Sequence, residues 1–363
     1  MENKDQVIEG LLQLSNMLIE QVTKLQNDNA ELKKREATLE MTVSQLMENQ
    51  KSLVETIGKN QRETMKLGET MTRSVDNVKY ELGMGKVENP EVATIEETVD
   101  AIVKNKASIC RFGDGEFSIM AGASRQGFQR QDDKLARRLL EVVQAREDNC
   151  LIAIADNYGS LDRYSYMSKN EIRYYMTDEV REQHAHFLES GRKYYNAYIT
   201  TPYMLYADRD TENPTIRFNA LKEIWKDKNL VIIEGNLSRL GVGNDLFASA
   251  KSIKRILGPA EHAFDKYDQI LEKAISVGNE YGKEEFLFVI ALGPTATVLA
   301  YDLYKAGFQA LDLGHIDNDY EYYIHNASER YAIPGKYVNN ITKENEVQDI
   351  DDELYKSQII IKF

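Results

Sequence analysis

The first part of the chain carries a heptad pattern of apolar residues. Leucine recurs every seven residues from Leu11 to Leu53 and returns at Leu67. A second apolar series, to which Ile8 and Val22 belong, runs three residues ahead of the leucines. Two series with this offset are the a and d positions of a coiled coil, and they persist well beyond the three or four repeats that indicate one. The pattern predicts a coiled coil over residues 1–80.

The kind of residue at each heptad position predicts how the helices associate. Branched residues at a over leucines at d favour a parallel dimer, and a polar Asn29 at an a position fixes the register. Residues 5–78 contain no proline and no segment that covers the apolar stripe. We therefore expect a homodimer formed through the coiled coil rather than a single exposed helix.

The heptads stop near Gly83 and Pro90, and the pattern changes from residue 95 onward. Proline disfavours helix in the residue before it, so residues 81–94 are expected to be a linker. Beyond it, short apolar runs typical of buried strands cover 108–112, 150–155, 230–234, 286–292 and 310–313. Amphipathic helical stretches cover 134–145, 216–226, 267–277 and 297–305. This alternation predicts an α/β domain, Rossmann-like with a parallel sheet, over 95–340.

The last segment, 341–363, is acidic and ends in three isoleucines followed by Lys362 and Phe363. An added strand and a docking segment are both compatible with this pattern.

Composition narrows the possible partners and compartments. The chain has 363 residues and a formal charge of −14, which argues against wrapping nucleic acid. Cys110 and Cys150 have no CxxC spacing, so neither a disulfide framework nor a thiolate zinc site is indicated. No apolar run approaches the roughly 18 residues of a membrane span, and no signal sequence is evident, so we expect a cytoplasmic protein.

The first buried strand leads into Arg111-Phe112-Gly113-Asp114-Gly115-Glu116. Loops at the carboxyl ends of strands bind ligands in open α/β sheets. In an extended turn, Asp114 and Glu116 project to one side, while Gly113 and Gly115 allow a ligand close to the backbone. Such a pair suits Mn²⁺ or Mg²⁺ bound together with substrate phosphate oxygens. A merely polar turn is the alternative.

Three further strand ends carry polar groups. The loop after 230–234 contains Arg239, Gly241, Gly243 and Asn244, whose backbone amides and guanidinium suit a phosphate, although it matches neither a Walker loop nor GxGxxG.

The strand at 286–292 leads into Thr295 at a helix start, which is either an anion site or an ordinary cap. The last strand leads into His315, Asp317 and Glu321, a candidate acid/base set. All four strand ends are expected to line one cleft.

With these motifs in place, the chain resembles the bacterial GT-D glycosyltransferases, typified by an enzyme that extends the glycan of streptococcal serine-rich adhesins. The matching segments are 111–117 (RFGDGEF), 238–247 (SRLGVGNDLF), 291–303 (ALGPTATVLAYDL) and 311–322 (LDLGHIDNDYEY). The resemblance implies a D-x-E motif at Asp114 and Glu116 that serves a divalent metal and the diphosphate of a nucleotide sugar. It does not extend to the coiled coil.

The function expected from this resemblance is metal-dependent transfer of a sugar, glucose or a related hexose, from a UDP-sugar to a glycan or glycoprotein acceptor. Arg111 and Arg239 would face the diphosphate, and Asp317, Glu321 or His315 would be the base. A non-catalytic coiled-coil scaffold with a nucleotide- or protein-binding domain is the alternative. A nucleotide-dependent oxidoreductase is disfavoured because the dinucleotide fingerprint is missing.

Overall fold

The computed structural model describes residues 2–123, 128–281, 286–339, 341 and 347–363. The chain divides into two units, Met1–Ser74 and Val75–Phe363. None of the helices in these described ranges combines the length and apolarity that crossing a bilayer requires.

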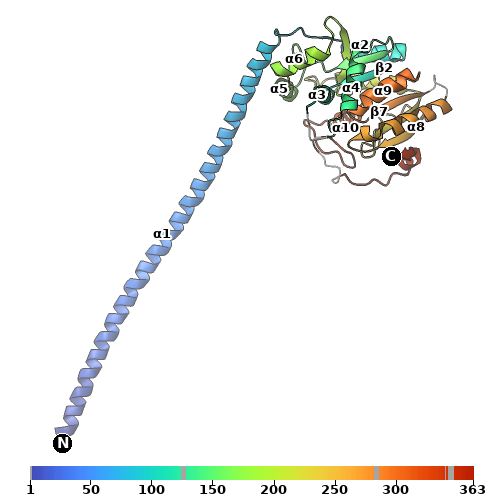
Figure 1. Cartoon of the computed structure of the whole chain (residues 1–363). Coiled ribbons are helices and arrows are strands. Elements are labelled where there is room, and N and C mark those ends of the chain that lie inside the picture. The colour runs from blue at the N-terminus through green and yellow to red at the C-terminus, as the bar shows by residue number, and fades with distance from the viewer. Residues whose placement is uncertain (1, 124–127, 282–285, 340, 342–346) are drawn as a thin grey trace. The chain divides into compact units, whose positions relative to one another are not determined.

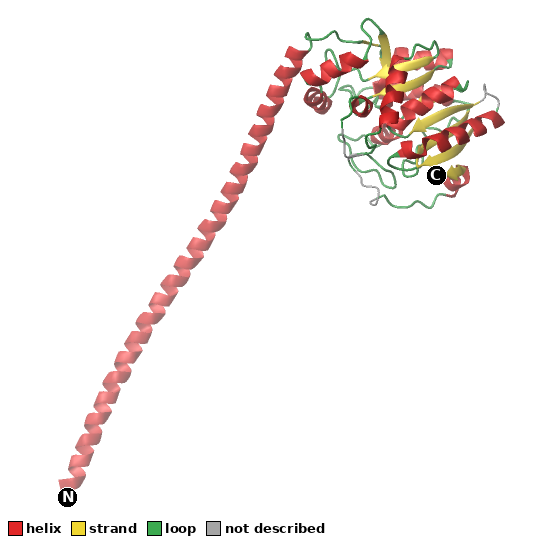
Figure 2. Cartoon of the chain, in the orientation of Figure 1, coloured by secondary structure: helices red, strands yellow, loops and turns green. Residues whose placement is uncertain are grey.

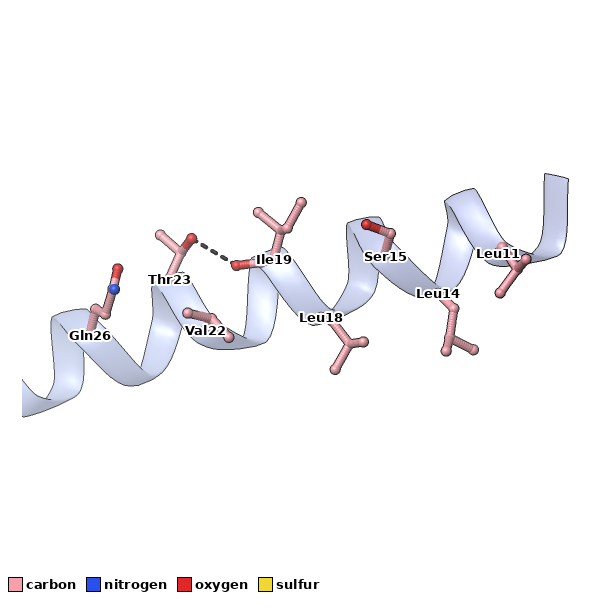
Figure 3. A pocket seen from close by; sticks show the side chains of 8 residues that line it. All are labelled: Leu11, Leu14, Ser15, Leu18, Ile19, Val22, Thr23 and Gln26. Atoms are coloured by element: carbon pink, nitrogen blue, oxygen red, sulfur yellow. Dashed lines mark hydrogen bonds between the residues drawn. The ribbon is translucent and has the colours of Figure 1, made fainter. Parts of the chain in front are cut away.

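Helix α1, Glu2–Gly83, is continuous over 82 residues, or about 120 Å at 1.5 Å per residue. Its heptad leucines are exposed in the single chain; Leu25, for example, is 67% exposed. A shallow groove runs beside Leu11, Leu14 and Leu18, and Figure 3 shows Leu14 and Leu18 pointing to one side of the helix while Ile19 points to the other. An apolar stripe of this length is what a partner helix covers in a coiled coil, and dimer formation stays a prediction.

The second unit is built on a nine-stranded sheet, shown in yellow in Figure 2, in which all neighbouring strands are parallel. The strands are β1 (Glu91–Val92), β2 (Ser108–Phe112), β3 (Cys150–Ile154), β4 (Lys193–Asn196), β5 (Asn229–Gly235), β6 (Ser252–Gly258), β7 (Phe286–Ala291), β8 (Ala310–Asp312) and β9 (Ile359–Lys362). Their order across the sheet is β1-β4-β3-β2-β8-β7-β5-β6-β9. The predicted parallel α/β architecture is confirmed.

Helices cover both faces of this sheet (Figure 1). The helices are α2 (Ile95–Asn105), α3 (Asp114–Met120), α4 (Asp133–Gln144), α5 (Tyr166–Tyr175), α6 (Asp178–Phe187), α7 (Asn213–Trp225), α8 (Tyr267–Glu280), α9 (Pro294–Lys305), α10 (Ile316–Ile324) and α11 (Glu353–Gln358), with 3₁₀ turns η1 (Ala197–Thr200) and η2 (Ala263–Lys266). On one face, α9 contacts α4 and α8, and α4 contacts α3. On the other, α7 contacts α2 and packs Phe218 against Tyr320 and Tyr323 of α10.

The core lies on both faces of the central strands. Leu287, Phe288, Val289 and Ile290 of β7 are all fully buried, which explains why β7 reads as an unbroken apolar run. Strand β6 was not expected from the sequence, because it carries a charged Arg255. The structure buries Arg255 against Glu234 of β5, with Nη1 and Oε1 2.5 Å apart, so the charge is satisfied inside the sheet.

The compact unit extends beyond the expected range of 95–340 at both ends. At the C-terminus, Ile359–Lys362 pairs with β6 as the edge strand β9, so the end of the 341–363 segment is an added strand.

At the other end, Tyr80 on the last turns of α1 is 1% exposed. Its hydroxyl lies 2.8 Å from the carbonyl oxygens of both Asn157 and Gly159, and the Arg181 guanidinium lies 4.5 Å from its ring centre. Residue 80, the expected end of the coiled coil, therefore belongs to the packing of the second unit.

The heptad register predicts a dimer that depends on the d positions. Replacing Leu25 and Leu32 together by Asp puts charges into the seam and is expected to give a monomer by light scattering, whereas the parent is expected to have the mass of two chains. The matched change of Asn27 and Lys34 to Asp falls on the outer face of the helix and is expected to leave the dimer intact. A monomeric parent, or a dimer in both variants, would contradict the register.

The packing of Tyr80 predicts where the chain can be shortened. Tyr80→Ala removes a buried ring and a bonded hydroxyl and is expected to lower the free energy of unfolding by about 3 to 5 kcal/mol, measured by denaturant titration. Tyr174→Ala, at a position 73% exposed, is the control and is expected to change little. A chain beginning at Val75 is accordingly expected to be more stable than one beginning at Glu88; equal stability of the two would refute the role of Tyr80.

Candidate active site

The chain leaves β2 and β8 in opposite directions, although these strands are neighbours in the sheet. After β2 it enters α3, which contacts α4 on the face covered by α9. After β8 it enters α10, which packs with α7 on the other face. Ligands of open α/β folds bind where two connections diverge at adjacent strand ends, and we call the region at the ends of β2 and β8 the crevice.

Asp114 and Glu116 lie on the β2 side of this crevice, in the first turn of α3. The extended turn expected from the sequence is therefore a helix start, with Gly113 as its extended N-cap residue. Asp114 is exposed, and Glu116 Oε2 accepts a hydrogen bond from the Gly113 N–H at 2.7 Å. Gly115 faces Pro294 at the start of α9, so the helix that follows β2 and the helix that follows β7 begin close to each other.

The pKa of Glu116 is raised to about 7. Burial is the main cause, and the negative charges of Asp312 and Asp114 add to it, against the stabilising bond from Gly113. The side chain still reaches solvent, which fits a group on the wall of a crevice. A cation beside these carboxylates would lower the electrostatic cost of ionising Glu116.

Arg111 is bound into the floor of the crevice. Its Nε donates to the Asp312 carbonyl at 2.7 Å, its Nη2 to Asp312 Oδ1 at 3.0 Å and its Nη1 to Thr200 Oγ1 at 2.8 Å. Thr297 Oγ1 on α9 lies 2.9 Å from the Arg111 carbonyl and 3.2 Å from Asp312 Oδ2. A methyl group on Gly314 would lie 2.7 Å from Arg111 Nη2, so the bare backbone there leaves room for the guanidinium. The guanidinium thus ties β2, β8 and η1 together.

This network includes Asp312, Thr200 and Thr297, which were not among the predicted site residues. The sequence feature that could have pointed to this network is Asp312, a charged residue near the end of an otherwise apolar predicted strand.

His315 lies on the β8 side of the crevice, and its side chain is exposed. Its pKa is lowered to about 4. The main cause is that the surrounding protein desolvates the imidazole; the positive charges of Arg111 and Arg330 lower the pKa further, and Asp114 acts in the opposite direction. The imidazole is therefore neutral at neutral pH. The structure brings His315 and Asp114 within electrostatic range of each other, from β8 and β2 respectively.

Asp317 and Glu321 belong to a different cluster, so the structure does not group them with His315. Lys336 Nζ donates to Asp317 Oδ2 at 2.7 Å and to Glu321 Oε1 at 2.8 Å, and Asn244 Nδ2 donates to both carboxylates at 2.8 and 2.7 Å. All three charged side chains are buried. Through these bonds the two carboxylates of α10 hold the helix to Lys336 and to the loop that contains Asn244.

The loop after β5 also makes hydrogen bonds that hold it to α10 and to the segment around Lys336. Arg239 Nη1 donates to the carbonyl oxygens of Gly335 at 2.6 Å and Gln348 at 2.7 Å, and its side chain is 5% exposed. Gly241, at φ 70°, donates its N–H to Asp317 Oδ1 at 2.8 Å, and a Cβ there would lie 2.5 Å from the Phe247 ring. Gly243 also has a positive φ of 82°. These residues shape the loop against α10 and the segment around Lys336.

Thr295 lies in the first turn of α9, close to Gly115 through the neighbouring Pro294. It is fully buried, and within the described parts of the chain its hydroxyl has no hydrogen-bond partner. An unpaired buried hydroxyl costs free energy, and a ligand oxygen at the helix start would satisfy it.

Over the described residues, no group of three or more His, Cys, Asp or Glu side chains lies close enough to form a metal cage by itself. The crevice instead offers the two carboxylates of the D-x-E motif. Mg²⁺ and Mn²⁺ are commonly held by one or two carboxylates together with substrate phosphates and water, so this donor set fits them better than it fits zinc.

Comparison with known proteins identifies the family. A family model described as "Glycosyltransferase GT-D fold" matches residues 109–341. A probable glycosyl transferase Gly of Streptococcus gordonii is 34% identical over 299 residues, which are 80% of this chain and 41% of that protein. Glycosyltransferase GlyD of Streptococcus pneumoniae serotype 4 is 35% identical over 280 residues, 75% of this chain and 32% of that protein. The chain thus spans less than half the length of these curated relatives.

Solved structures agree with these matches. A glycosyltransferase (DUF1792) from Streptococcus sanguinis superposes with a TM-score of 0.70 at 34% identity, covering 76% of this chain and 99% of that one. A second structure, of domain of unknown function 1792 and described as a distinct glycosyltransferase fold, gives a TM-score of 0.70 at 33% identity, covering 77% of this chain and 98% of the other. The predicted resemblance is confirmed, and the chain belongs to the GT-D fold glycosyltransferases.

Proposed function

We propose that the chain is a cytoplasmic, metal-dependent glycosyltransferase that moves glucose or a related hexose from a UDP-sugar to a hydroxyl of a glycan or glycoprotein acceptor. The observation that supports this most is the position of Asp114 and Glu116, at the crevice between β2 and β8, in a chain of the GT-D family.

In this proposal Asp114 and Glu116 hold Mn²⁺ or Mg²⁺. The raised pKa of Glu116 is consistent with it, because burial, and to a smaller extent the charges of Asp312 and Asp114, make the carboxylate costly to ionise and a cation would offset that cost. When bound, the ion would supply charge stabilisation for the leaving diphosphate. The backbone at Gly113 and Gly115 and the hydroxyl of Thr295 at the start of α9 are the groups we assign to the nucleotide sugar. Arg111 acts on the site by positioning Asp312 and the strand ends.

The loop with Arg239, Gly241, Gly243 and Asn244 was expected to bind the diphosphate. Because Arg239 is bound to two backbone carbonyls, we assign the loop a supporting role in the site instead.

Sugar transfer breaks the bond between the anomeric carbon and the phosphate oxygen and forms one to the acceptor oxygen. The proton of the acceptor hydroxyl must then leave to a base. We assign this role to His315, because its imidazole is neutral and lies within electrostatic range of Asp114. Asp317 and Glu321 are less suited, since Lys336 holds both carboxylates.

The proposal predicts that Asp114→Asn and Glu116→Gln each abolish metal-dependent release of UDP from a panel of UDP-sugars. Asp114 is exposed, so its replacement is expected to change the free energy of unfolding by no more than about 0.5 kcal/mol. Asp268→Asn is the control, because Asp268 is also an exposed carboxylate in the first turn of a helix, α8. Full activity in EDTA would overturn the metal role, and no release from any UDP-sugar would favour a binding scaffold instead.

The raised pKa of Glu116 predicts a pH dependence of stability. In the folded chain the carboxyl keeps its proton up to about pH 7, whereas unfolded glutamate loses it near 4.5. The folded state therefore binds more protons between these values, and the contribution of Glu116 to stability falls as pH rises through them. Glu116→Gln removes this loss while keeping an acceptor for the Gly113 N–H.

We expect the unfolding temperature of Glu116→Gln, relative to the parent in EDTA, to be higher at pH 8 than at pH 5. Glu272→Gln, on the exposed surface of α8, is expected to show the same difference at both pH values. A difference for Glu116→Gln that does not change with pH would contradict the assigned environment.

A further inference from the structure

A cavity with charged side chains in its lining opens on the same edge of the sheet as the crevice. It has a volume of about 430 Å³ and lies where β1, β4 and β3 end. Thr94 follows β1, Asn196 ends β4, and Asp156 follows β3. Its volume is in the range of small-molecule sites, roughly 300 to 1,000 Å³. None of its lining residues belongs to the crevice between β2 and β8.

Two arginine–aspartate pairs form the walls of this cavity. Arg163 Nη2 lies 2.5 Å from Asp156 Oδ2. Arg217 makes a bidentate pair with Asp208, at 2.9 and 2.6 Å, and its guanidinium lies 4.4 Å from the ring centre of Tyr206. The side chains are between 12% and 44% exposed, so all four reach the cavity.

The charge in the cavity excludes most ligand classes. Both arginines are already paired, and Glu96 adds a further negative charge at the rim, so the lining carries a net charge of −1. A phosphate would be repelled by the three carboxylates, which argues against the diphosphate of a sugar donor. For a bare cation, the lining offers a single carboxylate, Glu96, that neither of the two arginines pairs, because Asp156 and Asp208 are bound to the guanidinium groups.

A neutral ligand with many hydroxyl groups fits this lining. A hydroxyl both donates and accepts, so neighbouring hydroxyls can donate to a carboxylate and accept from the guanidinium paired with it. The paired side chains are held in place by each other, so little conformational entropy is lost when a ligand binds. Tyr206 also lines the cavity, and its ring packs against the Arg217 guanidinium, which leaves the residue 6% exposed.

The cavity lies close to the crevice. Tyr198 on η1 is within electrostatic range of both Asp156, in the cavity, and Asp114, in the D-x-E motif. The same turn, η1, ends in Thr200, which accepts a hydrogen bond from Arg111. One 3₁₀ turn therefore separates the two sites.

We propose that this cavity binds a neutral sugar unit of the acceptor glycan, and this inference rests on the proposed glycosyltransferase function. The paired groups of Arg163, Asp156, Arg217 and Asp208 recognise the hydroxyls, and η1 sets the separation between the bound acceptor and the D-x-E carboxylates.

The test measures saccharide binding directly, by saturation-transfer NMR on the full chain. Methyl glycosides of glucose, galactose and their N-acetylamino derivatives are the probes. We expect Arg163→Gln and Asp208→Asn each to weaken binding of the sugar that the parent binds by about tenfold or more, as for loss of a charged hydrogen bond. Asp208→Asn keeps the side-chain volume, and thermal unfolding of both variants verifies that they fold.

Arg146→Gln is the matched control, because Arg146 is 70% exposed, pairs with Glu189 and does not line the cavity. It is expected to bind the sugar as the parent does. The second readout is the ratio of sugar transfer to hydrolysis of the donor, which is expected to fall in Arg163→Gln and Asp208→Asn but not in Arg146→Gln.

A parent that binds none of the sugars, or folded Arg163→Gln and Asp208→Asn that bind them as the parent does, would overturn the cavity as a sugar site. Displacement of the bound sugar by UDP alone would also overturn it, because the ligand would then share the donor crevice. A parent that binds sugar at the cavity but releases UDP from no UDP-sugar would support the cavity while refuting the proposed function, so the two failures are distinguishable.

Discussion

The ion pair between Arg111 on β2 and Asp312 on β8 joins the two strands at which the connections of the sheet diverge. Strand β8 has only three residues, and its backbone register with β2 is confined to Ile109 and Leu311. Beyond that point the strands are held by side chains, and Arg111 with Asp312 supplies most of the bonds. A buried pair of this kind is sustained only when its remaining hydrogen-bonding groups are satisfied, which Thr200 and Thr297 do here.

This pair also contributes to the electrostatics of the crevice. Burial is the main cause of the raised pKa of Glu116 and of the lowered pKa of His315, and the charges of Asp312 and Arg111 add to these two shifts, so both groups are pushed toward their neutral forms. With Glu116 and His315 both shifted toward their neutral forms, the site without a ligand carries less charge than a count of its titratable residues indicates. Acid/base chemistry at neutral pH needs one group that can give a proton and another that can accept one, and local environments that shift the pKa values of the two groups provide this.

The sequence predicted the central strands because parallel strands buried on both faces must be apolar, as in β7. It failed at β6, where Arg255 makes the run look polar although Glu234 on β5 neutralises it. The partner that makes a charge tolerable lies on another strand, and a pattern of neighbouring residues cannot reveal it. The same limit explains Asp317 and Glu321. Their spacing with His315 suggests one acid/base set, but Lys336, from a later segment, binds both carboxylates and gives them a bracing role.

The position of Asp114 and Glu116 at a strand end could be predicted from the sequence because it depends only on local order, a buried strand followed by two glycines and two carboxylates. The cavity on the same edge could not be predicted, since its walls come from segments as distant as Thr94 and Arg217. Both nevertheless lie at the carboxyl ends of strands in one parallel sheet, where helix starts leave backbone and polar side chains facing outward. If the edge of the sheet holds the donor at β2 and β8, a second substrate that must meet it has to approach along the same edge. The cavity at β3 and β4 lies on this edge, and the 3₁₀ turn η1 lies between it and the D-x-E residues.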